Sequence, residues 1–507
     1  MKRSLRIFAL LIVLFTVLSL FCACLEPEET VSKESEASKE EKDPSFYGYD
    51  YPSNLKYGRT VKVLTTSTAP TATCYQIKPE SNPDYKAENM TAVLNSASEA
   101  TKLVEELMDI EVEEECIFTS SRYGGEMYQR ISRDALSYTA DYLVTMPCLN
   151  EAAMLAAEGL LYDLNDIVNL ENPWWCKPFN DSVTIAGKTF FASGDYGTIS
   201  MESTMFVAFN KELESSFGLA KGLGYESLYE MVDKMAWTQD VMFEMAKTVF
   251  DDSNGNQKAD PEDNLIGLSA QDNVVYWLLR AGGVKVCSVN GEGYPELTVN
   301  SERSLSLINN AQENLQDSAL GLIIADDYLS KKLPINPATQ VFIDGKCLFY
   351  FNSLSNLNII RVMEDDFGVL PCPIYDDTQD NYNNNVGSWT SNCVAVPTSV
   401  SSDDIVLAGH FLNALGAVSR ATLTPVFYEQ TLQYQISRDD DSMRMLDIIT
   451  ENRTPELAEM YRWGDMMSTI AWMRKQPVGT FASAYQRIED KTIDAIEKTV
   501  EAFKKQN

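Results

Sequence analysis

The loop of residues 252–263 carries oxygen-bearing groups at alternate positions. Alternate positions turn inward in a calcium-binding loop, and the last acid here stands in place of the usual bidentate glutamate. We expect one structural Ca2+, because a filled shell of hard oxygen ligands leaves no catalytic position. A plain Asn-Gly turn is the alternative, since Gln257 occupies the sixth position, where such loops have glycine. The expected ligands are Asp252, Asn254, Asn256, the carbonyl of Lys258, Asp260 and Asp263.

Histidine chemistry is nearly absent from this chain. His410 is the only histidine, so a Ser-His-Asp triad or a multi-histidine zinc site would have to be built around it. It lies in the apolar stretch 405–418, which is typical of a helix. Most hydrolase classes are therefore disfavoured. Glycoside hydrolases with a carboxylate pair remain open, because the chain has 74 Asp and Glu residues.

Cysteine spacing does not indicate a metal site. Eight cysteines follow Cys24, and no two of them form a CxxC pair. Disulfides are permitted outside the cell, but eight cysteines allow on the order of a hundred pairings, so the sequence cannot choose among them. Free buried thiols are the alternative.

The first residues predict export and a lipid anchor. A positively charged start and an apolar run, residues 7–21, are followed by Ala23 and Cys24. This order is typical of a signal peptide, and it resembles a bacterial lipoprotein signal with residues 1–23 removed and Cys24 lipidated. Cys22 is a competing acceptor, and an uncleaved membrane anchor is the alternative. Either way, the rest of the chain lies outside the cytoplasm.

A linker separates this leader from the folded part. Residues 24–46 are rich in Glu, Ser and Lys and poor in large apolar side chains, so we expect a disordered acidic tether. The whole chain has 41 Lys and Arg against 74 Asp and Glu, a formal charge of −33. Nucleic acid is therefore an unfavourable partner, because phosphate binding needs a basic surface.

The elements that must position the chemistry alternate between strands and helices. Residues 60–66, 142–146 and 204–210 have the β-branched and apolar composition of buried strands, and helical patterns follow the first two. Such alternation predicts parallel α/β lobes. The last third is helical, with predicted helices over residues 442–449, 455–461 and 481–503. Further strands are predicted over residues 348–351, 367–371 and 393–397.

Several segments, in order along the chain, resemble the family 1 extracellular solute-binding proteins, the maltose-binding-protein-like receptors of ABC importers. The resemblance implies an α/β, two-lobed periplasmic-binding-protein (type 2, Venus-flytrap) fold with hinge strands. Its lobes would be residues 56–204 plus 394–422 and residues 205–376 plus 423–507. A similar acidic loop holds calcium in some members. The landmarks are 173–175, 187–188, 194–195, 209–211, 237–238, the loop at Asp252, 342–346, 367–371, 442–453, Trp463 and 481–483.

The resemblance also implies a ligand between the lobes. Sugar sites pair aromatic platforms with amide or carboxylate hydrogen-bonding groups. The candidates are therefore such side chains near predicted strand ends and in the crossover, the segment of residues 371–393 that would return the chain to the first lobe. Core packing is the alternative for each aromatic residue. The candidates are Asp195, Tyr196, Gln271, Asp272, Asn273, Tyr276, Trp277, Asn352 and Trp389.

Two functions from different classes follow. We expect a lipid-anchored, monomeric receptor on the outer face of the cell membrane. It would bind a carbohydrate, with an oligosaccharide as the expected kind, and deliver it to an ABC permease without catalysis. A surface-anchored carboxylate-pair glycoside hydrolase is the alternative, and a carbohydrate sensor without a permease is a third possibility.

Overall fold

The computed structural model describes residues 45–67, 75–433 and 440–506. They belong to one compact unit, Ser45–Asn507. The predicted signal peptide, Cys24 and all but the last two residues of the predicted linker lie outside the described residues. Within the described ranges, no helix is at once long and apolar enough to cross a bilayer.

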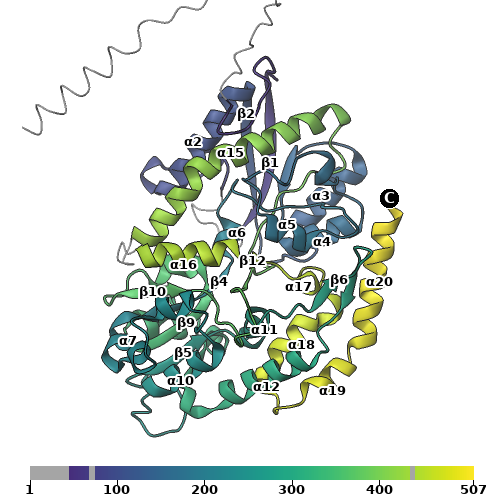
Figure 1. Ribbon diagram of the computed structural model, residues 1–507. Helices are drawn as coiled ribbons and strands as arrows, with labels where there is room; N and C mark the ends of the chain where they lie inside the picture. Colours follow the sequence, from purple (N-terminus) through teal and green to yellow (C-terminus); the bar gives the residue numbers. More distant parts are fainter. Residues whose placement is uncertain (1–44, 68–74, 434–439, 507) are drawn as a thin grey trace, which may run out of the picture. The chain divides into compact units, whose positions relative to one another are not determined.

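The first sheet has three parallel strands in the order β2-β1-β3. They are β1 (Arg59–Ser67), β2 (Ile110–Phe118) and β3 (Val144–Met146). Strands β1 and β3 confirm the strands predicted over residues 60–66 and 142–146. Helix α2 (Ala92–Met108) connects the first two strands. It begins at Thr91, whose side chain accepts a hydrogen bond from the Leu94 N–H. The long helix α15 (Ser402–Gln433) packs along α2 (Figure 1).

The second sheet has five strands in the order β10-β4-β9-β5-β8. Strand β4 runs antiparallel to both of its neighbours, whereas β5 is parallel to β9 and β8. The expectation of a purely parallel sheet was therefore wrong here. The reason is that β4 enters beside the carboxyl end of β9, with Met205 opposite Ser353, and so must run against it. Its strands are β4 (Met205–Asn210), β5 (Ile266–Ala270), β8 (Leu322–Ile324), β9 (Cys347–Ser353) and β10 (Phe367–Leu370).

Further elements surround the two sheets. The other strands are β6 (Cys287–Val289), β7 (Pro295–Leu297), β11 (Asn384–Asn385) and β12 (Arg453–Thr454). The other α-helices are α3 (Glu126–Ser137), α4 (Leu149–Ala157), α5 (Lys177–Val183), α6 (Ile199–Glu202), α7 (Lys211–Phe217), α8 (Leu219–Gly222), α9 (Leu228–Asp233), α10 (Gln239–Val249), α11 (Val274–Ala281), α12 (Glu302–Gln316), α13 (Pro337–Ile343), α14 (Leu357–Ile360), α16 (Asp440–Glu451), α17 (Leu457–Met460), α18 (Met466–Trp472), α19 (Phe481–Gln486) and α20 (Glu489–Lys505).

Three stretches that run between the two sheets lie side by side. Thr204, just before β4, forms an antiparallel bridge with Val386, and the Val386 N–H donates to the carbonyl of Thr454 at 3.2 Å. Strands β11 and β12 extend this contact as a parallel pair. Strand β4 itself lies inside the second sheet, and the hinge strands stay a prediction.

Two predicted elements were wrong in detail. Residues 393–397 form isolated bridges rather than a strand, because Val394, Ala395 and Pro397 each pair with a different segment and no ladder extends. The predicted helix over residues 481–503 is divided into α19 and α20. Gln506, just after α20, donates to the Ala156 carbonyl at 2.9 Å. The C-terminal helix thus contacts residues assigned to the first lobe, and the lobe boundaries stay a prediction.

The segment that follows the predicted linker packs on α15. The Tyr49 hydroxyl lies 2.5 Å from Nδ1 of His410, and the Tyr51 ring meets the same imidazole edge to face. Tyr49 also packs against the ring of Trp174. Burial lowers the pKa of His410, which favours its neutral form. The single histidine is therefore a packing residue on a helix, as the apolar sequence around it predicts.

The cysteines follow one of the two alternatives that the sequence leaves open, and Trp237 is a core residue. The described cysteines after Cys74 are all free thiols, and six of the seven are buried. Trp237 is fully buried, and Thr238 caps α10 by accepting a hydrogen bond from the Val241 N–H. Cys74 lies outside the described residues.

Candidate functional site

Two of the candidate ligand residues meet at neighbouring strand ends. Gln271 directly follows β5, and Asn352 is the second-last residue of β9. Gln271 Nε2 donates to Asn352 Oδ1 at 3.2 Å, and Asn356 Nδ2 donates to the same oxygen at 3.0 Å. Asn352 Nδ2 in turn donates to the Tyr350 hydroxyl at 2.8 Å. The carboxyl edge of the second sheet therefore carries a connected amide network, at the edge where α/β proteins bind ligands.

Asp272 forms ion pairs with two basic residues of the chain itself. Its carboxylate forms ion pairs with Arg474 and, at 2.6 Å, with Lys475, and its N–H donates to Asp326 at 2.8 Å. Partial burial opposes ionisation, but these two cations hold the pKa of Asp272 below its usual value. Asn273 is partly exposed at the start of α11. Asp272 therefore fixes the C-terminal helices to the second sheet.

Three aromatic candidates are core residues. Tyr196, Tyr276 and Trp277 are each at most 5% exposed. The Tyr276 hydroxyl donates to Glu459 at 2.9 Å, and Trp277 packs on Phe351. The structure thus contradicts a ligand platform at these positions, because none of the three rings offers an open face. Tyr276 and Trp277 lie in α11, every residue of which is buried, and the apolar sequence of this helix does not distinguish full burial from burial of one face.

Asp195 connects a loop to α15. Its carboxylate accepts from Arg420 at 3.2 Å and from the Thr424 hydroxyl at 3.0 Å. Burial raises the pKa of Asp195, and the guanidinium of Arg420 opposes that shift. These contacts use both carboxylate oxygens, so the structure gives Asp195 a role in packing rather than in an open pocket.

Trp389 is the one aromatic candidate with an open ring face. Its side chain is 45% exposed, while its carbonyl accepts a hydrogen bond at 2.8 Å from the buried guanidinium of Arg122. Arg122 directly precedes Tyr123, which is also exposed and lies under the guanidinium of Arg462. A ring with a fixed main chain and a free face suits an apolar ligand surface.

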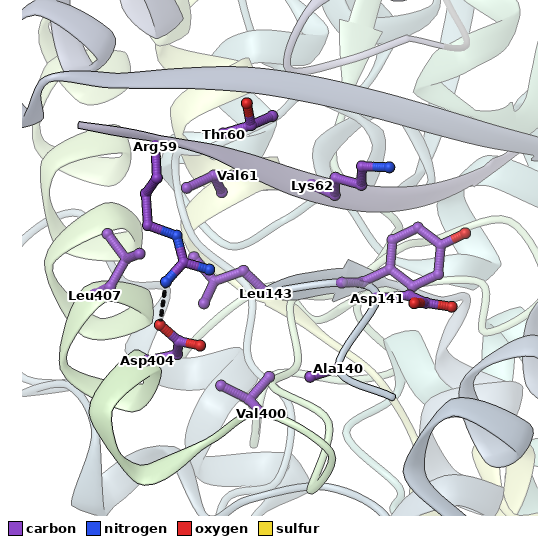
Figure 2. A pocket seen from close by; sticks show the side chains of 11 residues that line it. Arg59, Thr60, Val61, Lys62, Ala140, Asp141, Leu143, Val400, Asp404 and Leu407 are labelled. Carbon is purple, nitrogen blue, oxygen red and sulfur yellow. Dashed lines mark hydrogen bonds and ion pairs between the residues drawn. The ribbon is translucent and has the colours of Figure 1, made fainter. Parts of the chain in front are cut away.

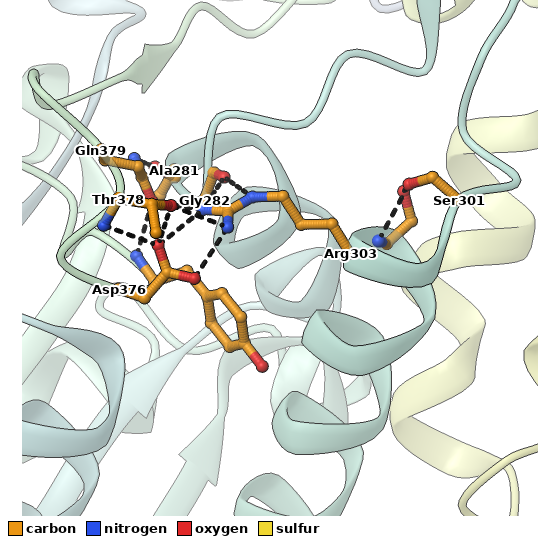
Figure 3. A network of polar contacts seen from close by, with 9 residues as sticks. Ala281, Gly282, Ser301, Arg303, Asp376, Thr378 and Gln379 are labelled. Carbon is orange, nitrogen blue, oxygen red and sulfur yellow. Dashed lines mark hydrogen bonds and ion pairs between the residues drawn. The ribbon is translucent and has the colours of Figure 1, made fainter.

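A polar network fixes the crossover segment that bears Trp389. Arg303 of α12 bonds both carboxylate oxygens of Asp376, at 2.7 and 3.2 Å, and donates to the Gly282 carbonyl (Figure 3). Gln379 accepts from Arg303 at 3.2 Å and donates to the Ala281 carbonyl at 2.9 Å. The bidentate pair is geometrically specific, so this end of the crossover is held against α11 and α12.

A small cavity lies where elements flanking both sheets meet, and the sequence reasoning missed it. It has a volume of about 80 Å³. Glu202, at the end of α6, presents a carboxylate that accepts from the Thr198 hydroxyl at 2.7 Å. Burial raises the pKa of Glu202. Glu202 lies in a four-residue helix, and no local sequence pattern marks such an acid. The lining residues are Gln76, Thr91, Val93, Leu94, Ala97, Thr198, Glu202, Asn358, Leu423 and Phe427.

The chemistry of this cavity is mixed and carries no positive charge. Amide, hydroxyl and carboxylate groups line it beside aliphatic and aromatic carbon, and no described lining residue is a lysine or arginine. Asn358 reaches it from α14, two residues after Asn356 of the amide network. A neutral ligand with both hydroxyl groups and apolar faces matches such a lining.

A larger cavity, about 180 Å³, lies elsewhere. Arg59, Lys62 and Asp404 line it at the amino-terminal half of β1 (Figure 2). Arg59 and Asp404 form an ion pair at 2.5 Å, so neither charge is available to a ligand without breaking the pair. It is also remote from the carboxyl ends of the strands, where ligands bind in this class of sheet. We therefore assign the smaller cavity to the candidate site.

The acidic loop adopts a compact turn in which oxygen-bearing side chains converge. Asp252 accepts from the N–H groups of Asn256 at 3.1 Å and Gln257 at 2.7 Å. The side-chain amides of Asn254 and Asn256 both donate to Asp260 Oδ2, at 3.1 and 2.9 Å. Their side-chain oxygens accept from the N–H groups of Asn256 and Lys258, at 3.0 and 2.8 Å, so a bound cation would have to replace these two contacts.

Asp263 supplies the observation that bears on a cation. Its side chain is fully buried, and its Oδ1 has no hydrogen-bond partner among the described residues. Its Oδ2 accepts from the Asp260 N–H at 3.0 Å, and Lys346 Nζ donates to the carbonyl of Asp263 at 3.2 Å. No three His, Cys, Asp or Glu side chains in the described ranges form a metal cluster, so a cation here needs amide and carbonyl oxygens too. Hard oxygen donors of this kind fit Ca2+.

Comparisons with solved structures identify the fold. No family model and no curated protein sequence matches the chain. The galacto-N-biose-/lacto-N-biose I-binding protein of the ABC transporter from Bifidobacterium longum is 13% identical, over 88% of this chain and 98% of that one, with a TM-score of 0.55. An ABC substrate-binding protein from Listeria monocytogenes in complex with cycloalternan is 13% identical, over 87% and 100%, with a TM-score of 0.53.

A third structure agrees with these two. The maltose-binding periplasmic protein MalE from Listeria monocytogenes, in complex with maltose, is 14% identical over 89% of this chain and 99% of that one, with a TM-score of 0.51. The chain therefore has the α/β periplasmic-binding-protein fold of the MalE-type substrate-binding proteins, as the resemblance in the sequence predicts.

Proposed function

We propose that this protein is a lipid-anchored receptor that binds a neutral carbohydrate and delivers it to an ABC permease. The observation that carries the proposal is the cavity around Glu202, which combines hydroxyl-binding groups with apolar walls and lacks cations, in a fold whose similar structures are sugar-binding proteins. A binding role needs no catalytic pair, and the similar structures are described as binding proteins rather than enzymes.

A ligand screen tests the receptor function. Neutral mono- and oligosaccharides are added to the full chain in detergent, and the melting temperature is followed. A ligand that binds only the folded state stabilises it by mass action, by about 2.7 kcal/mol at a hundred times its Kd. Each hit is then incubated with the protein and assayed for new reducing ends. Stabilisation without turnover supports the receptor, whereas turnover would establish the glycoside hydrolase instead.

The anchor is supported by the sequence around Cys24. We expect Cys24→Ala to release the protein from the membrane, because the lipid would be attached to that thiol. Cys22→Ala is the matched control and should leave the protein in the membrane fraction. Release by the Cys22 variant alone would overturn the proposed cleavage site.

The acidic loop is proposed to bind one structural Ca2+. The convergence of Asn254, Asn256 and Asp260, and the buried oxygen of Asp263 without a partner, support this proposal. Asp252, the carbonyl of Lys258 and the three converging groups would hold the ion with Asp263. Bound calcium would neutralise like charges and fix the turn.

Calorimetry on metal-stripped protein tests the calcium proposal. We expect one binding event with Ca2+ and none after Asp252→Ala, with Asp251→Ala as the control in a neighbouring exposed acid. If the unmodified protein gave no heat with Ca2+, the calcium proposal would be wrong and the loop would be a plain Asn-Gly turn. Neither result bears on sugar binding, because the loop does not line the cavity.

A further inference from the structure

A buried glutamate holds the loop between β1 and α2. Strand β2 has four acids, of which three are exposed, whereas Glu114 faces inward and is only 5% exposed. Its Oε1 accepts from the Thr65 hydroxyl at 2.7 Å and from the Gln76 N–H at 3.0 Å. Its Oε2 accepts from the N–H groups of Ile77 at 2.8 Å and Lys78 at 2.7 Å. Three consecutive main-chain amides are thus fixed by one side chain.

This arrangement sets the place of the Gln76 side chain. Gln76 is 7% exposed, and its side chain lines the cavity. Its Oε1 lies so close to Gly197 that a Cβ at Gly197 would be 3.3 Å away. Its Nε2 has no hydrogen-bond partner among the described residues. A buried amide N–H without an acceptor is costly, so a donor in this position indicates an acceptor brought by a ligand.

Gln76 and Glu202 complement each other in the cavity. Both line it, one with an amide that donates and the other with a carboxylate that accepts. A sugar hydroxyl does both, so a pair of this kind recognises hydroxyl groups on a neutral ring. A ligand carboxylate or phosphate would meet the Glu202 carboxylate without a compensating cation.

We propose that Gln76 is a specificity-determining ligand contact, which donates a hydrogen bond to a hydroxyl of a neutral sugar, and that Glu114 is the residue that positions it. This inference rests on the proposed carbohydrate receptor function. It assigns the recognition of one hydroxyl to the β1–α2 loop and predicts that sugars bearing a carboxylate at that position are rejected.

Titration calorimetry with a sugar that binds the unmodified full chain provides the test. Gln76→Ala should weaken binding by about tenfold or more, equivalent to one hydrogen bond of about 1.4 kcal/mol, while the melting temperature of the free protein stays nearly unchanged. Glu114→Gln should weaken binding and also speed hydrogen exchange at the amides of residues 76–78. Glu113→Gln, an exposed neighbour on the same strand, is the control and should change neither quantity.

Deoxy sugars locate the hydroxyl. The deoxy analogue that lacks the hydroxyl bound by Gln76 should bind the unmodified protein about tenfold more weakly, and should lose no further affinity on Gln76→Ala. Equal affinities of the unmodified protein and Gln76→Ala for every sugar would overturn this inference and leave the receptor function standing. If the unmodified protein bound no sugar, both proposals would fail together.

Discussion

Two loops of this protein are each organised around a buried carboxylate, and they differ in how that carboxylate is satisfied. Glu114 receives four hydrogen bonds from Thr65 and from the main chain of residues 76–78, so both of its oxygens have partners within the chain. Asp263 is as deeply buried, yet one of its oxygens has no partner among the described residues. The carboxylate of the first loop is satisfied within the chain, whereas that of the second leaves one oxygen for the calcium ion that we propose.

The comparison predicts that removing Glu114 has the largest effect on stability. Glu114→Ala leaves the N–H groups of residues 76–78 and the Thr65 hydroxyl without their acceptor, and unsatisfied buried donors cost 1–3 kcal/mol each before relaxation. We expect the free energy of unfolding to fall by about 3 kcal/mol, measured by urea denaturation. Glu113→Ala, with its side chain in solvent, should change it by less than about 0.5 kcal/mol. Equal effects of the two variants would erase the distinction.

A second prediction concerns Asp263, whose effect should depend on calcium. With Ca2+ at a hundred times its Kd, the unmodified protein should gain about 2.7 kcal/mol over the metal-free protein. Asp263→Asn should lose most of that gain, because an amide replaces a charged ligand. Thermal melts with and without a chelator measure both values. A gain that persists in the variant would show that the buried oxygen is not a ligand.

Glu202 has fewer hydrogen-bond donors than Glu114, and its effect on stability should depend on pH. Among the residues that the structure describes, one donor, the Thr198 hydroxyl, reaches its carboxylate. Burial raises its pKa above the ordinary value of 4.5, so its contribution to stability is full below that value and is lost as pH rises through the raised pKa. Glu202→Gln should therefore gain stability relative to the unmodified protein between pH 4 and 7, by at most about 1 kcal/mol after solvent screening. A constant difference across this range would contradict the pKa shift.

Lys346 gives the smallest predicted effect. Its ammonium donates to the carbonyls of Pro261 and Asp263, at 3.3 and 3.2 Å, and so holds the end of the acidic loop. Lys346→Met should keep the packing of the side chain and cost about 0.5–1 kcal/mol, less in calcium than in chelator. Urea denaturation under both conditions measures it. A larger loss in calcium would mean that the lysine supports the sheet rather than the loop.

The sequence predicted the elements that depend on local patterns. Strand alternation and the helical setting of His410 were confirmed, since each follows from neighbours along the chain. The direction of β4 was not predictable, because it depends on where the chain enters the second sheet. The same limit explains Tyr276, whose burial follows from helices that pack on α11 from distant parts of the sequence.

The candidate site shows the same division. Gln271 and Asn352 were placed at strand ends by their positions after apolar runs, and the structure joins them. Gln76 and Glu202 were missed, since no local pattern marks a glutamine in a loop or an acid in a four-residue helix. Glu114 did leave a signal in the sequence, as the acid at an inward position of an alternating strand.

The contact between the tyrosine segment and α15 also has a mechanical consequence. Tyr49 and Tyr51 bind the imidazole of His410, and Tyr49 packs on Trp174, immediately after the predicted tether. If Cys24 carries the lipid, as we propose, a pull on the chain would act on the contact between these rings and one long helix. The three adjoining crossings at Thr204, Val386 and Thr454 lie elsewhere in the chain. Drag on a tethered molecule would then act on the contact between these tyrosines and α15, and not directly on the connections between the sheets.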